Sequence, residues 1–197
     1  MKRRERDNGS LRVLGIDPGS QICGYGIIEQ DGEKGLGGYA YVASGRIELS
    51  SGSPLHIRLN EIYSALAEII QEYRPVQAAI ERVFFARSVK AALHLGHARG
   101  VSMLAATAEG LQVYEYSAVE VKKAVVGYGR AEKSQVQAMV KAILNLTTAL
   151  SPDSADALAL SICHLNTMKF PPYGNRNLRT ALEKSKSKNS SQRTGLG

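Results

Sequence analysis

Short apolar runs separated by glycine-containing turns occupy the first quarter of the chain. Residues 11–16 form one run, which ends in the turn sequence Asp17-Pro18-Gly19-Ser20. Residues 23–29 and 38–49 form two more. Apolar runs bounded by Gly and Pro are typical of β-strands. Because the connections are short, we expect these three strands to pair as an antiparallel meander.

The pattern then changes to a helical period. Apolar residues recur at three- and four-residue spacing across residues 55–73, and Pro75 ends this predicted helix. A short apolar strand over residues 76–80 then runs into Glu81. Residues 88–109 are rich in alanine and predict a second, long helix that stops at Gly110.

A fifth strand and two more helices complete the predicted order. The strand covers residues 113–116, and the helices cover residues 133–144 and 152–168, the last with Ser151 as N-cap. The order is therefore β-β-β-α-β-α-β-α-α. This order predicts one α/β domain over residues 11–169, with a mixed five-stranded sheet and helices on both faces.

Composition narrows the class of protein. Of the 197 residues, 44% are hydrophobic and 22% charged, which is ordinary for a globular chain. No apolar run approaches the roughly 20 residues that span a bilayer, and the charged N-terminus lacks a hydrophobic signal core. Cys23 and Cys163 lie far apart and favour neither a disulfide framework nor a zinc site. We expect a soluble, cytoplasmic protein with no membrane partner.

The positive charge is concentrated at the two ends. The net charge is +7, of which residues 1–10 contribute +2 and residues 170–197 contribute +5, so residues 11–169 are neutral overall. Both ends are predicted to be disordered basic tails, because they are polar and lack apolar periodicity. Such tails attract phosphate without sequence specificity. A neutral domain can still bind DNA if its acids gather in one pocket and its basic residues lie elsewhere.

Four acidic residues stand where predicted elements begin or end. Asp17 and Glu81 each close a strand, and Asp153 and Asp156 share one face in the first turn of the last helix. A turn, a helix dipole or a solvated surface also explains the three aspartates. Glu81 lies between apolar runs and needs a partner if it is buried. If the four acids meet, they suit two hard cations such as Mg²⁺ or Mn²⁺ for phosphodiester hydrolysis.

Several segments together resemble the RuvC family of Holliday junction resolvases. They cover most of the predicted domain, at residues 15–20, 24–26, 80–86, 96–100, 121–127, 131–136 and 153–159. The resemblance implies an RNase H-like fold and a homodimer that nicks two opposite strands of a four-way DNA junction. It also implies two Mg²⁺ per active site, with Mn²⁺ as a substitute, and the RuvAB branch-migration complex as partner. In this resemblance, four residues of this chain match the catalytic, metal-binding acids of the family: Asp17, Glu81, Asp153 and Asp156.

The same resemblance selects candidate DNA contacts. Lys122 and Lys133 match the family's DNA-contacting lysines, and Phe84 matches a residue that stacks on an unpaired base. Phosphate contacts would orient a duplex arm without reading its bases. A solvated lysine face and a core phenylalanine are the ordinary alternatives. The complete set of predicted DNA-binding residues is Phe84, Arg87, Lys90, Lys122, Lys123, Arg130 and Lys133.

Other readings of the sequence remain open at this point. The Asp17-Pro18-Gly19-Ser20 loop is also typical of actin-like ATPases and sugar kinases, although 197 residues supply only one of their two lobes. A non-catalytic DNA-binding module and a related nuclease that cuts other branched DNA or RNA are further alternatives. Gly96 and Gly100, four residues apart in the alanine-rich helix, allow close packing within the monomer or across a dimer.

Overall fold

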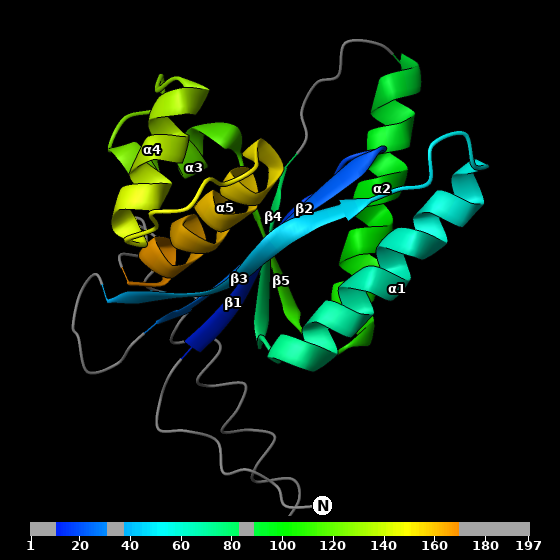
Figure 1. The fold of residues 1–197 in the computed structure, drawn as a ribbon, viewed down its shortest axis with the longest axis horizontal. Helices are drawn as coiled ribbons and strands as arrows, with labels where there is room; N and C mark the ends of the chain where they lie inside the picture. Colours follow the sequence, from blue (N-terminus) through cyan, green and yellow to red (C-terminus); the bar gives the residue numbers. More distant parts are fainter. Residues whose placement is uncertain (1–10, 31–37, 83–88, 170–197) are drawn as a thin grey trace, which may run out of the picture. The chain divides into compact units, whose positions relative to one another are not determined.

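A five-stranded sheet forms the centre of the computed structural model, which describes residues 11–30, 38–82 and 89–169 (Figure 1). The strand order is β3-β2-β1-β4-β5. β1 pairs antiparallel with β2 and β2 with β3, whereas β1, β4 and β5 run parallel. The predicted meander and the mixed five-stranded sheet are therefore confirmed. The strands are β1 Leu11–Asp17, β2 Ile22–Gln30, β3 Tyr39–Glu48, β4 Gln77–Glu81 and β5 Gln112–Tyr116.

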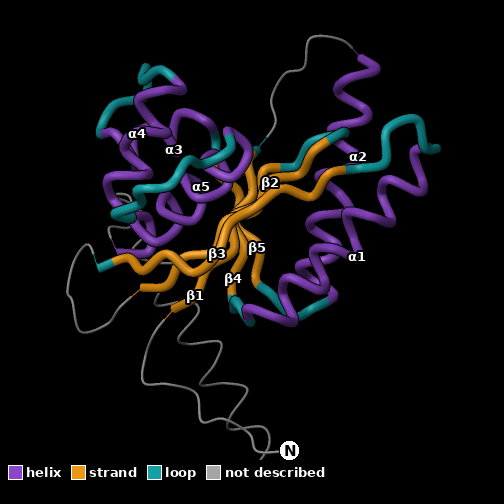
Figure 2. Tube along the Cα trace, in the orientation of Figure 1, coloured by secondary structure: helices purple, strands orange, loops and turns teal. Residues whose placement is uncertain are grey.

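Helices cover both faces of this sheet, as predicted (Figure 2). One face packs against α1 and α2, and the opposite face packs against α3, α4 and α5. No helix in the described ranges is long and apolar enough to cross a bilayer. The helices are α1 Leu55–Tyr73, α2 Val89–Ala108, α3 Ala118–Val126, α4 Lys133–Ile143 and α5 Pro152–Lys169.

The chain divides into two units, residues 1–165 and residues 166–197. The first unit holds the sheet, the first four helices and most of α5. In the second unit the structure describes only the last turn of α5. The predicted tails, residues 1–10 and 170–197, lie outside the described residues.

Alternation along the strands gives each face its own core. In β1, Val13 packs in the cluster that contains α3, α4 and α5, whereas Leu14 packs in the cluster that contains α1 and α2. In β4, Ala79 lies on the α5 side and Ile80 on the α2 side. Successive side chains of a strand point to opposite faces. The residues at the ends of these two strands, Asp17 and Glu81, are therefore expected on the α5 side.

One helix, α3, is not among the helices predicted from the sequence. It lies directly after β5, in a segment of only nine residues that periodicity alone does not identify. Ser117 and Glu120 form a reciprocal capping box at its start, and Gly127 ends it with a φ of 93°, a left-handed conformation that favours glycine. The Ser-x-x-Glu pattern and the following glycine were the signals that would have predicted it. The correct order is β-β-β-α-β-α-β-α-α-α.

Candidate active site

Asp17 and Glu81 lie side by side at the carboxyl ends of neighbouring strands. β1 and β4 are parallel and in register, with Ile16 opposite Ile80. Asp17 follows Ile16 and is the last residue of β1, and Glu81 follows Ile80 and is the last residue of β4. Parallel strands bring their carboxyl ends to one edge of the sheet. Two carboxylates 64 residues apart in sequence are thus neighbours because of strand register alone.

Glycines in the sheet let α5 bring the two aspartates of its first turn to the same edge. Gly24 is the antiparallel partner of Asp17, and a Cβ on Gly24 would lie 2.3 Å from the carbonyl oxygen of Asp153. A Cβ on Gly15 would lie 1.9 Å from the carbonyl oxygen of Ala157. No other residue permits so close an approach of helix backbone to strand. Asp153 is therefore held over the strand pair that carries Asp17.

The electrostatics show that these acids act on one another. Burial, then the charges of Asp156 and Glu81, raises the pKa of Asp17 to about 7, and Lys133 acts in the opposite direction. Burial and the charge of Asp156 also raise the pKa of Glu81. Like charges that share a partly buried site resist ionisation. The cluster therefore has an excess of negative charge that a cation would relieve.

One lysine already relieves part of that charge. The Nζ of Lys133, the first residue of α4, lies 2.5 Å from Oδ2 of Asp156. Burial raises the pKa of Asp156, whereas the hydrogen bond from Lys133 lowers it. The same hydrogen bond raises the pKa of Lys133. The side chain of Lys133 remains 60% exposed, so its charge is also accessible to a ligand.

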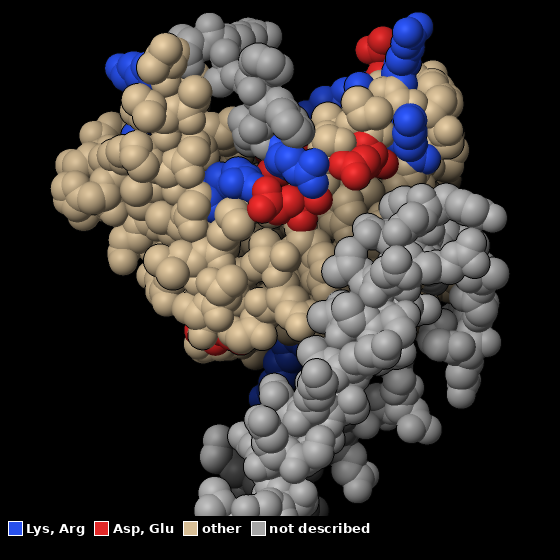
Figure 3. Space-filling view, turned by 180° about the vertical axis from the view of Figure 1, so that it is seen from behind, with Lys and Arg blue, Asp and Glu red and all other residues tan. Residues whose placement is uncertain are grey.

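A cavity of about 250 Å³ adjoins the acids between α3, α4 and α5. Its apolar wall includes Val121 and Val136. Four charged residues also line it, namely Glu81, Lys122, Lys133 and Asp156. Figure 3 shows a face of the molecule on which acidic side chains gather with basic side chains beside them. Mixed charge of this kind suits a ligand that carries both a cation and a phosphate.

The donor chemistry of the cluster fits a hard divalent cation. All four acids offer carboxylate oxygens, which are the ligands of Mg²⁺ and Mn²⁺. Among the described residues, however, no three Asp, Glu, His or Cys side chains are close enough together to hold an ion. The acids thus share one end of the sheet without converging on a single point, and Lys133 is paired with one of them.

The predicted DNA-binding residues do not all fall in one place. Lys122 and Lys133 line the cavity beside the acids. Lys123 and Arg130 are exposed on α3 and on the loop that follows it, and Lys90 is exposed at the start of α2. Phe84 and Arg87 lie outside the described residues. No role was predicted for Arg99, whose Nε donates a hydrogen bond to the carbonyl oxygen of Glu81.

Together, the strand order, the helices on both faces and the acids at one sheet end define an α/β protein of the RNase H-like class. The model of the family "Crossover junction endodeoxyribonuclease RuvC" matches residues 13–164 of this chain. This chain therefore belongs to the RuvC family. The match settles the choice among the sequence-based readings in favour of a junction endonuclease, against an ATPase or a non-catalytic module.

Individual relatives agree with this assignment. The crossover junction endodeoxyribonuclease RuvC of Geobacter sulfurreducens is 49% identical over 157 residues, which cover 80% of this chain and 93% of that protein. The RuvC of Shewanella amazonensis is 52% identical over 155 residues, covering 79% and 87%. The structure of T. thermophilus RuvC in complex with Holliday junction substrate is similar with a TM-score of 0.75 and 32% identity, covering 81% of this chain and 95% of that one.

Proposed function

We propose that this endonuclease resolves four-way DNA junctions by nicking two opposed strands through metal-dependent phosphodiester hydrolysis. The observation that carries the proposal is the placement of Asp17, Glu81, Asp153 and Asp156 at the same end of the sheet, where the charges of the other three act on Asp17, in a chain of the RuvC family. Burial and mutual repulsion raise the pKa values of Asp17 and Glu81. Perturbed pKa values of this kind are typical of functional sites.

The four acids would hold two Mg²⁺ ions, which Mn²⁺ could replace. When bound, such a pair supplies a hydrolytic nucleophile at neutral pH and stabilises the leaving oxygen of the phosphodiester. The protein's part is to orient the acids and the DNA. Strand register fixes Asp17 beside Glu81, and the close packing of α5 fixes Asp153. Lys122 and Lys133, on the cavity wall, would pair with backbone phosphates and place the scissile bond over the acids.

A homodimer is the proposed assembly, and α2 offers a surface for it. Val89, Leu93 and Leu104 are exposed at 79%, 57% and 58% and lie on one side of this helix. Gly96 and Gly100 lie on the same side with nothing within 4 Å of an added Cβ, so a second helix can approach closely. A two-fold dimer would present two equivalent sites to a junction of the same symmetry. RuvAB is proposed as partner, and the cytoplasm as location, on the family resemblance alone.

Cleavage of a mobile four-way junction beside a linear duplex of the same sequence tests the proposed function. With Mg²⁺ we expect paired nicks at symmetric positions in the junction, leaving 5′-phosphate and 3′-hydroxyl ends. We expect no cutting of the duplex, and no cutting of either substrate in EDTA. Equal cutting of both DNAs, or cutting of the junction in EDTA, would contradict the proposal.

The position of Lys122 and Lys133 on the cavity wall leads to a separate prediction about DNA binding. Lys122→Ala should weaken junction binding by about three- to tenfold at moderate salt and reduce the salt slope by about one, because one phosphate contact is lost. Lys133→Ala should act similarly. Lys141→Ala, which changes a half-buried lysine at the other end of α4, is the matched control. Measuring the dissociation constant across a salt series gives both quantities. An unchanged slope in the Lys122 variant would assign that lysine to an ordinary solvated face.

A further inference from the structure

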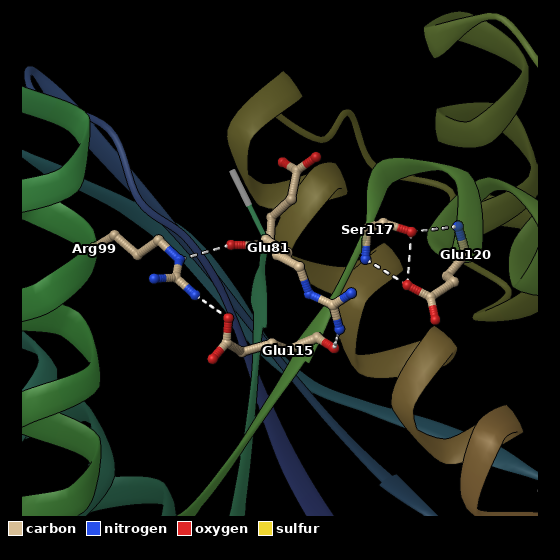
Figure 4. Close-up of polar contacts among 6 residues, drawn as sticks. Glu81, Arg99, Glu115, Ser117 and Glu120 are labelled. Carbon is tan, nitrogen blue, oxygen red and sulfur yellow. Dashed lines mark hydrogen bonds and ion pairs between the residues drawn. The ribbon is translucent and has the colours of Figure 1, made fainter. Parts of the chain in front are cut away.

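Arg99 links α2 to the strand end that carries Glu81. Its Nε donates to the carbonyl oxygen of Glu81 at 3.0 Å. Its Nη2 forms an ion pair with the carboxylate of Glu115 on β5. Figure 4 shows that the Arg99 guanidinium reaches both partners, while the carboxylate of Glu81 points away from it. One planar guanidinium thus bridges two neighbouring strands from the adjacent helix.

The contacts around this arginine hold the main chain where the sheet ladder ends. Glu81 is the last residue of β4 and is opposite Tyr116 of β5. Beyond it, the amide of Arg82 donates to the carbonyl oxygen of Tyr116 at 2.7 Å, and the Arg82 side chain donates to the carbonyl oxygen of Glu115 at 3.1 Å. The terminal residues of a strand have fewer ladder bonds than its interior, so the side-chain contacts of Arg99 and Arg82 add to the main-chain bond that holds this strand end.

We propose that Arg99 is a positioning residue for the active site, and that it sets the direction of the Glu81 carboxylate by clamping the Glu81 main chain to α2 and to Glu115. This inference rests on the proposed role of Glu81 as a metal-binding acid. Its contacts are with the main chain of Glu81 and the carboxylate of Glu115, so it would act on the site through Glu81. Residues that orient a metal ligand commonly change metal affinity or activity by about 10–100-fold when replaced.

The geometry explains why Arg99 should affect metal binding more than folding. Its side chain is 21% exposed and that of Glu115 is 38% exposed, so solvent partly screens their ion pair and reduces its contribution to stability. The Glu81 side chain, in contrast, lines the cavity with Lys122, Lys133 and Asp156. A rotation of the Glu81 main chain would move its carboxylate relative to these groups.

Arg99→Met removes both contacts while keeping an unbranched, helix-compatible side chain. We expect a roughly 10–100-fold lower turnover at subsaturating Mg²⁺, a Mg²⁺ midpoint about tenfold higher, and a dissociation constant for junction DNA within about twofold of the parent. A readout without DNA or catalysis is the rise in melting temperature on adding Mn²⁺, which should be clearly smaller in the variant at the same Mn²⁺ concentration.

Arg12→Met is the matched control, because Arg12 has the same kind of contacts at the other end of β1. Its guanidinium pairs with Glu29 at 2.5 Å and also donates to the carbonyl oxygen of Tyr73. This variant should retain the parent's Mg²⁺ midpoint. If it shifts the midpoint as much as Arg99→Met does, the effect reflects general loosening and the positioning role is wrong.

Two further variants keep the test decisive if Arg99→Met folds poorly. Arg99→Lys keeps the positive charge but loses the planar guanidinium that reaches both partners. Its Mn²⁺-induced stabilisation should therefore lie between that of Arg99→Met and that of the parent. Glu115→Gln leaves the bond from Arg99 to the Glu81 carbonyl available and should shift the Mg²⁺ midpoint less than Arg99→Met. Parent-like midpoints in both Arg99 variants would overturn the inference while leaving the proposed function intact. A parent protein that fails to cut junctions would instead contradict the proposed function.

Discussion

Replacing Asp17 with asparagine is expected to lower the rate of junction cutting by about two to three orders of magnitude. Asp17 is the most strongly perturbed of the four acids, and it lies beside both Glu81 and the first turn of α5. An amide keeps the shape of the side chain but loses the charge that would hold a cation. Loss of a few kcal/mol of metal-derived stabilisation corresponds to this change in rate. Single-turnover nicking of a synthetic junction in Mg²⁺ measures it.

The stability of the same variant shows whether a loss of cutting comes from the chemistry. The pKa of Asp17 is raised to about 7 from 3.8 for an unperturbed group, so its ionisation opposes folding. This unfavourable contribution grows as the pH rises from about 4 to about 7 and is absent below that range. In metal-free buffer at pH 8, Asp17→Asn should therefore melt no lower than the parent, and any advantage in melting temperature should shrink towards pH 4.

Junction binding by Asp17→Asn should persist, because one less negative charge faces the phosphates. A variant that cuts as fast as the parent would refute the metal assignment.

Gly15→Ala is expected to destabilise the protein by about 3 kcal/mol or more, and to lower the melting temperature by roughly 10 °C. The new Cβ would lie 1.9 Å from the carbonyl oxygen of Ala157 and 2.6 Å from Oγ of Ser161, both on α5. The nearest obstacle is helix backbone, which cannot rotate away as a side chain can. Relief therefore requires α5 to move off the sheet. Thermal and urea denaturation measure the loss, and cutting should fall as Asp153 and Asp156 are displaced.

Gly45→Ala provides the comparison for this prediction. Gly45 also lies within a strand, but the atoms nearest to its added Cβ belong to the Tyr25 ring, at 2.7 Å. A tyrosine side chain can rotate, so the expected loss is smaller, about 1–2 kcal/mol. Equal and small losses in the two variants would show that α5 does not depend on close approach at Gly15.

The sequence predicted the sheet well, because each strand and most helices carry their own periodic signal. The placement of Asp17 and Glu81 at strand ends could be read directly, since both follow apolar runs. That the two strands are neighbours depends on contacts between distant segments, which no local pattern contains. Helix α3 was missed because nine residues are too few for a clear period, although its capping residues were present.

The chemistry of the site could be predicted only in part. Spacing alone left the acids compatible with turns, helix caps and solvated surface, and the resemblance to a family chose among these readings. The pairing of Lys133 with Asp156 depends on how α4 lies against α5. The contact of Arg99 with the main-chain oxygen of Glu81 could not be predicted from the residue types, because any residue at position 81 would present the same carbonyl.

The ion pair between Lys133 and Asp156 implies that Asp156 and a DNA phosphate compete for Lys133 in the proposed reaction. A single ammonium group cannot fully serve an aspartate and a DNA phosphate at once. A cation that takes over Asp156 would free Lys133 for the phosphate, and a phosphate that draws Lys133 away would free Asp156 for the cation. By thermodynamic reciprocity, each would then tighten the binding of the other by the same factor. Such coupling would keep the enzyme poorly charged with metal until its nucleic acid arrives.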